Sequence, residues 1–226
     1  MEQKNKKFIS CLFSTIVWFF VFVVILIMVK YVDVDFLGEN GTAIGLSTIN
    51  NKFYQAHSTL NETFYKITKY MGYFCFLVMG FFALKGLIQL IKRKKLSAVD
   101  IDLLVLGGIY ILTLAFYVFF ELVPISFRPI IVEKPGESSF PSSHTFLTVV
   151  VMMCSILYVS IHSQNTIIKI TLSILAIVFS ILMIYLRALS GVHWFTDIVA
   201  GVLLGVSISF LYLTILLGIA NKISKN

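Results

Sequence analysis

Two short polar stretches stand out in an otherwise apolar sequence, because they concentrate groups that can hold and transform an anion. The first begins at Arg128 and ends in the run FPSSH at residues 140–144. The second contains Arg187, His193 and Asp197. Guanidinium groups match phosphate oxygens with two parallel hydrogen bonds, and paired histidine and carboxylate groups serve nucleophilic catalysis. The two stretches therefore predict chemistry on a phosphate ester.

His193 and Asp197 are spaced to work as a pair. Residues four apart at the start of a helix lie on one face, within reach of each other. A carboxylate on one imidazole nitrogen fixes the tautomer and stabilises the positive charge that develops when the other nitrogen attacks. This spacing predicts His193 as a nucleophile and Asp197 as its orienting partner.

The run at residues 140–144 is typical of a helix start. Serine is favoured at the N-cap, and here Ser142 and Ser143 follow a proline. The N-terminus of a helix offers free backbone N–H groups and the positive end of the helix dipole, which together form an anion site. His144, just inside this start, is placed to protonate a leaving oxygen. Taken singly, a histidine at a membrane boundary or an arginine that snorkels is ordinary; their joint occurrence indicates a site.

The composition shows which kind of element must position these groups. Of 226 residues, 58% are hydrophobic and only 13% are charged, and the mean hydropathy is +0.94. Soluble domains carry about a quarter of charged residues, so the bilayer must be the solvent for this chain. Eighteen Lys+Arg against eleven Asp+Glu give a net charge of +7. The basic residues cluster at the ends of apolar runs, as membrane anchors do, so we expect no nucleic-acid partner.

Six apolar segments are long enough to cross a bilayer as helices, since about 20 residues are needed. They cover residues 8–29, 70–91, 101–123, 143–161, 167–186 and 198–218. The first is longer than the core of a signal peptide and no cleavage site follows it, so we interpret it as a retained helix. The expected fold is all-α: one integral membrane domain over residues 1–226, a six-transmembrane-helix bundle with its motif-bearing core at 101–218.

Basic residues predict the orientation, because they gather on the cytoplasmic side of membrane proteins. Six spans bring to one side Lys4, Lys6, Lys7, the run at 92–95, Lys169, Lys222 and Lys225. The loops 30–69, 124–142 and 187–197 then lie on the other side. We therefore expect both termini in the cytoplasm and the polar stretches at the outer face of a bacterial plasma membrane.

The long outer segment between the first two spans contains Leu46, Ile49 and Phe53, a spacing that predicts an amphipathic helix lying on the bilayer. A second apolar set continues toward the second span: Leu60, Phe64 and Ile67. A plain surface helix and a substrate-guiding role both remain open for this segment.

The order and spacing of the polar residues resemble the type-2 phosphatidic acid phosphatase (PAP2) family, whose pattern is Lys-x6-Arg-Pro, Pro-Ser-Gly-His and Ser-Arg-x5-His-x3-Asp. This chain has Arg128-Pro129, then Pro141-Ser142-Ser143-His144, then Arg187-x5-His193-x3-Asp197. The resemblance implies a phosphohistidine on His193 with Asp197 as its partner and His144 as the general acid. It implies phosphate binding by Arg128, Arg187, Ser142 and Ser143. It also implies that neither a cofactor nor a metal is needed, and no acidic cluster in the sequence suggests one.

The main departure from the family pattern is Glu121, which stands where the pattern has lysine. A carboxylate cannot bind phosphate directly, so we expect Glu121 to pair with Arg128, with Arg187 or with an amine on the substrate. Lys134, in the same loop as Arg128, could supply the missing charge. Two smaller departures are Ser143 in place of the glycine and Leu186 in place of the serine.

The sequence therefore predicts a membrane lipid phosphatase whose substrate is phosphatidate, phosphatidylglycerol phosphate or a polyprenyl diphosphate. The expected partners are this lipid phosphate and the surrounding membrane lipids, and the oligomeric state is left open. Two alternatives stay beside this prediction. A phosphotransferase of the same family would share the phosphohistidine and differ in its acceptor, and a catalytically weak lipid-binding protein is suggested by the lost lysine.

Overall fold

A computed structural model describes residues 2–38, 41–56 and 60–223 of the chain, and these ranges contain helices and no β-strand. Six long helices are apolar enough to cross a membrane: α1 (Glu2–Tyr31), α3 (Glu62–Arg93), α4 (Ile101–Leu122), α5 (Ser143–His162), α6 (Thr166–Leu189) and α7 (Phe195–Ile223). A short helix, α2 (Ser47–Ala56), and a 3₁₀ turn at Leu96–Ala98 complete the fold. The predicted all-α bundle of six spans is confirmed.

The second span begins earlier than its hydropathy predicts, at Glu62 rather than at residue 70. Asn61 caps this helix, because its side-chain oxygen accepts a hydrogen bond from the backbone N–H of Phe64 at 3.0 Å. Asn61 also donates its own N–H to the carbonyl of Ser190, 3.2 Å away, in the loop before α7. The extra turns of α3 therefore lie beside the second polar stretch of the sequence.

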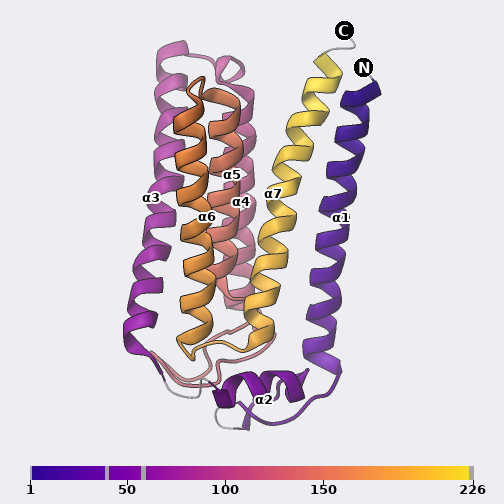
Figure 1. The fold of residues 1–226 in the computed structure, drawn as a ribbon, viewed down its shortest axis with the longest axis vertical. Helices are drawn as coiled ribbons and strands as arrows, with labels where there is room; N and C mark the ends of the chain where they lie inside the picture. Colours follow the sequence, from indigo (N-terminus) through magenta and orange to yellow (C-terminus); the bar gives the residue numbers. More distant parts are fainter. Residues whose placement is uncertain (1, 39–40, 57–59, 224–226) are drawn as a thin grey trace.

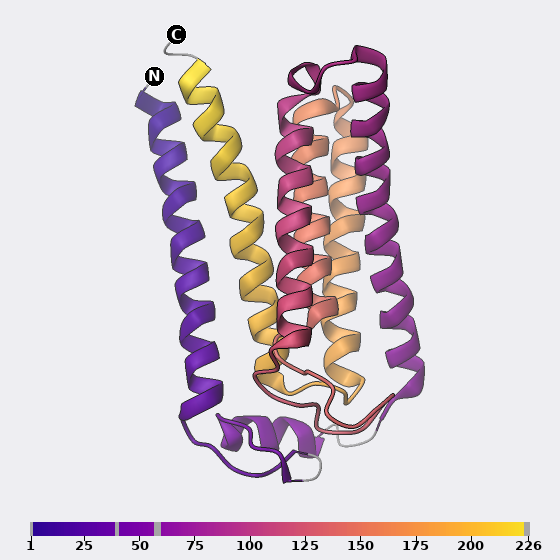
Figure 2. The ribbon, with the colours of Figure 1, turned by 180° about the vertical axis from the view of Figure 1, so that it is seen from behind.

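The helix α5 is central to the bundle, since it packs against α3, α4, α6 and α7. On the far side of α7 lies α1, and these two helices share the most extensive interface in the described chain. Both views show α3 to α6 gathered as one group beside the α1–α7 pair (Figures 1 and 2). This order places the starts of α5 and α7 next to each other.

The two ends of the bundle differ in what they carry. The chain termini lie at one end, whereas α2 and the connections from α4 to α5 and from α6 to α7 lie at the other (Figure 1). The basic run 92–95 and the segment around Lys169 share the end of the termini. Lys225 falls outside the described residues. The alternation of spans agrees with the predicted topology, and the side of the membrane that each end faces stays a prediction.

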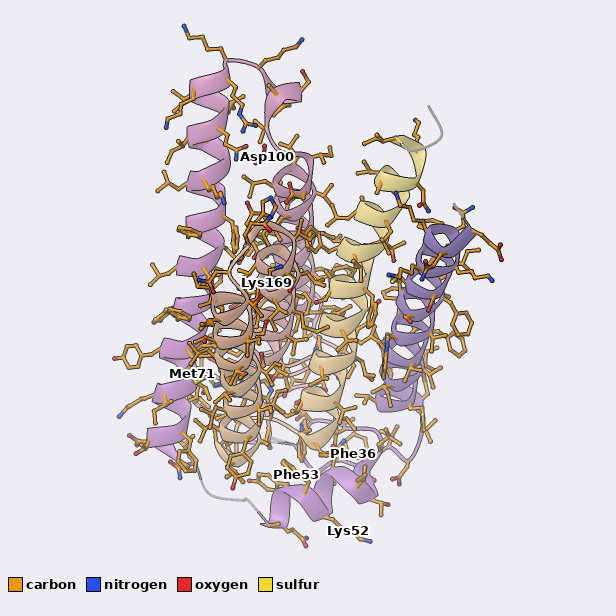
Figure 3. All side chains as sticks on the ribbon, turned by 45° about the horizontal axis from the view of Figure 1, so that its top comes forward. Phe36, Lys52, Phe53, Met71, Asp100 and Lys169 are labelled. Atoms are coloured by element: carbon orange, nitrogen blue, oxygen red, sulfur yellow. The ribbon has the colours of Figure 1, made fainter. Side chains whose placement is uncertain are left out.

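The short helix α2 lies across the end of the bundle, beneath the start of α7 (Figures 1 and 2). Its buried face is polar: the Asn50 amide donates to Thr196 Oγ1 at 3.0 Å, and its oxygen accepts from the Thr196 N–H at 3.2 Å. The Phe53 ring centre lies 5.5 Å from that of Phe195, while Lys52 points away from the bundle (Figure 3). Hydrogen bonds between Asn50 and Thr196 therefore hold α2 against the start of α7.

The amphipathic prediction for this segment is correct only in part. A helix does form; Leu46 and Phe53 are partly buried against the protein, whereas Ile49 remains 47% exposed, and the placement of the helix on the bilayer stays a prediction. The second apolar set is divided by the helix boundary: Leu60 precedes the cap of α3, and Phe64 and Ile67 belong to that span. Spacing alone could not reveal that Asn50 would find partners on α7.

Glycines let α7 approach α5 unusually closely. A Cβ atom at Gly201 would lie 2.8 Å from the carbonyl oxygen of Ser142, and one at Gly205 would lie 2.7 Å from Cβ of Val149. Both distances are shorter than real carbon contacts, so only glycine fits at these positions. Glycines four residues apart form the small-residue motif by which membrane helices pack closely. This contact holds the first turn of α5 against the first turns of α7.

Gly205→Ala should therefore destabilise the protein, because overpacking a tight contact costs about 1–3 kcal/mol. We expect a lower apparent melting temperature of the purified protein in detergent micelles. Gly80→Ala is the matched control, since a Cβ atom there meets nothing within 4 Å, and its melting temperature should equal or exceed that of the wild type. Equal melting temperatures for the two variants would contradict the close packing of α5 and α7.

Candidate active site

The predicted pair of His193 and Asp197 forms at the start of α7. His193 Nδ1 lies 3.4 Å from Asp197 Oδ2, and both side chains are almost fully buried. The same carboxylate oxygen accepts hydrogen bonds from the Trp194 N–H, at 2.8 Å, and from the hydroxyl of Ser139. Ser139 Oγ also lies 3.3 Å from His193 Nδ1. Asp197 is thus held by groups from both polar stretches of the sequence.

These hydrogen bonds indicate which nitrogen of His193 carries the proton. The Ser139 hydroxyl uses its hydrogen on Asp197, so its oxygen can only accept from His193. Nδ1 then bears the hydrogen, and Nε2 keeps its lone pair. Nε2 is buried and has no hydrogen-bond partner in the described protein. This tautomer suits nucleophilic attack by Nε2.

Burial keeps the His193 imidazole neutral. Desolvation lowers the pKa of His193 well below its usual value, and the nearby charges of Arg187 and Arg128 lower it further. A neutral imidazole retains the lone pair that a nucleophile needs. Both arginines are therefore close enough to His193 to affect its pKa, as the sequence predicts for a phosphate site.

Arg187 is fully buried at the end of α6. Its Nη1 donates to Thr68 Oγ1 at 3.2 Å, and its guanidinium lies over the ring of Tyr65, with Cζ 5.4 Å from the ring centre. Nε and Nη2 have no hydrogen-bond partner, and no carboxylate of the described ranges lies within ion-pairing distance. A buried cation without a counter-ion is costly, so this geometry favours an anion at the free edge of the guanidinium.

The start of α5 brings His144 to the site, and the predicted helix start is confirmed, with Ser142 at the N-cap position. The Ser142 hydroxyl bonds to the hydroxyl of Thr145 at 3.0 Å and does not cap the helix. The first backbone N–H groups of α5 are therefore not satisfied by Ser142, as an anion site requires. The His144 ring lies against α3, where a Cβ atom at Gly72 would be 2.7 Å from its Cδ2.

A cavity of about 380 Å³ opens beside His144, and the buried side chains of His193, Asp197 and Arg187 do not line it. His144 and Arg128 line it, together with Glu121 and Lys134. The other residues that line the cavity are Tyr65, Lys69, Gly72, Tyr73, Phe76, Tyr117, Glu133, Glu137 and Leu147. Its lining includes charged groups of both signs, which fits a charged headgroup.

The partner of Arg128 differs from the one expected. Arg128 Nη1 lies 2.9 Å from Glu137 Oε2, in a geometry that does not qualify as a hydrogen bond, so both groups keep hydrogen-bonding capacity. Glu121 forms no ion pair within the part of the chain that the structure describes, and it lines the cavity as an exposed carboxylate. The expected pairing of Glu121 with an arginine is therefore wrong in this structure. Glu137 is closer to Arg128 because both lie in the loop before α5.

Sequence reasoning missed the contributions of Ser139 and of α3. Ser139 lies only two residues before Pro141, but nothing in its local sequence marks it as the bridge between His193 and Asp197. The hydropathy of the second span begins at residue 70, which places Tyr65 and Thr68 in the preceding outer loop. The cap at Asn61 was the one local signal that could have extended this helix.

Comparisons with known proteins agree with this arrangement. The model of the PAP2 superfamily matches residues 70–219, which is more than half of the chain. A crystal structure described as a transmembrane PAP2 type phosphatidylglycerolphosphate phosphatase from Bacillus subtilis superposes with a TM-score of 0.60. The alignment covers 93% of this chain and 98% of that chain at 19% sequence identity, so this likeness concerns the fold. No curated protein sequence gives a significant match. The family match, together with six membrane helices and the three sequence blocks meeting at one end of the bundle, shows that the chain is a multi-pass membrane protein of the PAP2 superfamily.

Proposed function

We propose that this protein is a membrane lipid phosphatase that hydrolyses phosphate mono- or diesters of lipids through a phosphohistidine intermediate. The observation that carries the proposal is the buried Arg187 guanidinium, whose free Nε and Nη2 groups accompany the unpartnered Nε2 of His193. A cation with free donors beside a neutral nucleophile fits a phosphate ester better than any uncharged substrate. Membership of the PAP2 superfamily supports the same reaction.

In the first step, Nε2 of His193 attacks the phosphorus atom. A P–N bond forms while the ester P–O bond breaks, and His144 gives a proton to the leaving oxygen. The positive charge that develops on the imidazole is stabilised by Asp197 through Nδ1. Arg187, Arg128 and the free N–H groups at the start of α5 hold the equatorial oxygens, and Ser143 lies at the same helix start.

In the second step, water attacks the phosphorus atom of the phosphohistidine. His144, now without its proton, accepts one from this water, and the P–N bond breaks to release inorganic phosphate. Neutral His193 and protonated His144 are restored together. A phosphotransferase would share the first step and use another hydroxyl in place of water in the second.

The substrate is proposed from the position of the cavity. It lies at the end of the bundle, where a membrane-embedded chain meets the lipid headgroups, and the outer faces of α3 and α6 expose many large apolar side chains to lipid. A lipid phosphate can therefore place its headgroup in the cavity while its tails stay in the bilayer. Phosphatidate, phosphatidylglycerol phosphate and polyprenyl diphosphates all meet this requirement. We further propose that this end faces outward from a bacterial plasma membrane.

Purified protein should release inorganic phosphate from at least one of these lipids, and His193→Ala should abolish the release. Loss of a nucleophile typically reduces turnover by about 10⁴-fold or more, and Asp197→Asn should reduce it by roughly 10²–10⁴-fold. His162→Ala is the matched control, because His162 lies at the opposite end of α5. Trapping of an acid-labile phosphoenzyme in the wild type alone would support the covalent step.

Substantial turnover by a folded His193→Ala variant would contradict the phosphohistidine. Binding of lipid phosphates by the wild type without any phosphate release would instead favour the catalytically weak lipid-binding alternative. Transfer of the phosphoryl group to an added alcohol in preference to water would favour the transferase.

The protonation state of His193 gives a second test. Because its pKa is lowered in the folded protein, His193 should remain neutral at pH 6.5, where a solvated imidazole is about half protonated. Its contribution to stability is then fully present above pH 6.5 and is lost as pH falls toward the lowered pKa. An NMR titration of histidine labelled at Cε1, assigned with His193→Gln, measures the midpoint. A midpoint at or above 6.5 would contradict a neutral nucleophile.

The orientation can be tested by cysteine labelling in intact cells. Gln55→Cys on α2 should react with a membrane-impermeant thiol reagent, whereas Ser97→Cys, at the other end of the bundle, should react only after lysis. Both side chains are exposed, so the difference reports the membrane side and not burial. The variants are made in a Cys11→Ser background, because Cys75 and Cys154 are buried and Cys11 is not. The reverse labelling pattern would place the cavity in the cytoplasm.

A further inference from the structure

One face of α3 lines the candidate site over two turns. Tyr65, Thr68, Lys69 and Gly72 share this face, since residues three and four apart on a helix are neighbours. Tyr65 and Thr68 contact the Arg187 guanidinium, and Gly72 contacts the His144 ring. Lys69 lies between these contacts and lines the same cavity as His144. Arg187 and His144 therefore flank the place from which Lys69 extends.

In this structure the Lys69 ammonium forms an ion pair with Glu133. Lys69 Nζ lies 2.7 Å from Glu133 Oε1, and the Tyr65 hydroxyl donates to the same oxygen at 3.1 Å. The side chains of Lys69 and Glu133 are 39% and 56% exposed. Ion pairs this exposed contribute little to stability, so the ammonium can exchange Glu133 for a doubly charged phosphate.

Binding of a phosphate in the cavity requires a positive charge that Glu121 does not supply. Glu121 stands on α4 where the PAP2 pattern has lysine, and of the two arginines of the site only Arg128 lines the cavity, where the Glu137 carboxylate 2.9 Å away offsets its charge. Lys69 and Arg128 line the same cavity as His144. Lys134 also lines the cavity, but it extends from the exposed loop and lines a second, smaller pocket as well.

We propose that Lys69 of α3 is a phosphate-binding residue of this site, and that it supplies the positive charge that the family pattern places at the position of Glu121. This inference rests on the proposed phosphatase function and deepens it. Lys69 lies one residue before the match to the family model, which begins at residue 70. The family pattern therefore could not identify Lys69. In the substrate complex, the ammonium leaves Glu133 and donates to a phosphate oxygen.

The experiment measures the affinity of the purified protein for inorganic phosphate, from the rise of its melting temperature with phosphate concentration. This readout requires no turnover. Lys69→Ala should weaken phosphate binding roughly tenfold to a hundredfold, as expected for loss of a charge-assisted hydrogen bond. Lys69→Arg should keep most of the affinity, because the charge remains.

Three control variants separate phosphate binding from a structural effect. Lys66→Ala removes a lysine of the same helix that is paired with Glu62 at 2.9 Å and does not line the cavity, so its affinity should equal that of the wild type. Glu133→Gln removes the competing carboxylate and should tighten phosphate binding. Equal losses for Glu133→Gln and Lys69→Ala would show that the ion pair is structural and would overturn the inference. A loss in Lys134→Ala without a loss in Lys69→Ala would assign the role to Lys134 instead.

A double variant tests the equivalence of the two positions. Lys69→Ala combined with Glu121→Lys returns a lysine to the cavity from α4 and should recover phosphate affinity to within about threefold of the wild type, a small part of the expected loss. Absence of recovery would overturn the equivalence. If the wild type hydrolysed lipid phosphates and Lys69→Ala bound phosphate as tightly, only this inference would fail. If the wild type neither bound phosphate nor released it from lipids, the proposed function would fail as well.

Discussion

The contact between the first turns of α5 and α7 is the constraint on which the site depends. A Cβ atom at Gly201 or Gly205 of α7 would lie within 2.8 Å of Ser142 or Val149, so the two helices approach more closely than larger residues would allow. The Ser142 N–H donates to the Asp197 carbonyl at 2.9 Å across this contact, so the backbones themselves are joined. Ser139 reaches Asp197 from the same side. If α5 and α7 lay further apart, His144 on α5 and His193 just before α7 would be too far from each other to act on the same group.

Around this contact, the protein tolerates polar groups that a bilayer would reject. Arg187, His193 and Asp197 are buried, yet they lie at the end of the bundle and not at its middle, where ionisable groups are most costly. One carboxylate oxygen of Asp197 accepts two hydrogen bonds, from Ser139 and from the Trp194 N–H, whereas Nε and Nη2 of Arg187 have no acceptor in the described protein. The buried guanidinium is thus left without a counter-ion by the described protein, which supports the proposal that an anion such as phosphate binds there.

The sequence predicted the parts of the site that are local and missed those that depend on packing. His193 and Asp197 are one helical turn apart, and Ser142 begins a helix, so their spacing alone determined the result. The six spans followed from hydropathy, because solvent determines that pattern. Ser139 and Thr68 acquire their roles only when distant helices meet. The pairing of Arg128 with Glu137 likewise depends on the path of one loop, which neither composition nor periodicity determines.

The placement of the two tryptophans has an optical consequence. Trp18 lies on α1, where 39% of it is exposed to the surroundings of the bundle. Trp194, next to His193, is fully buried, lies with its ring centre 5.5 Å from that of Tyr54 in a tilted arrangement, and donates its indole N–H to the Phe127 carbonyl at 2.8 Å. The emission of Trp194 therefore reports on the loop between α6 and α7, and that of Trp18 on lipid or detergent. Any rearrangement that breaks the bond to Phe127 exposes the indole and shifts its fluorescence to longer wavelengths, without an added label.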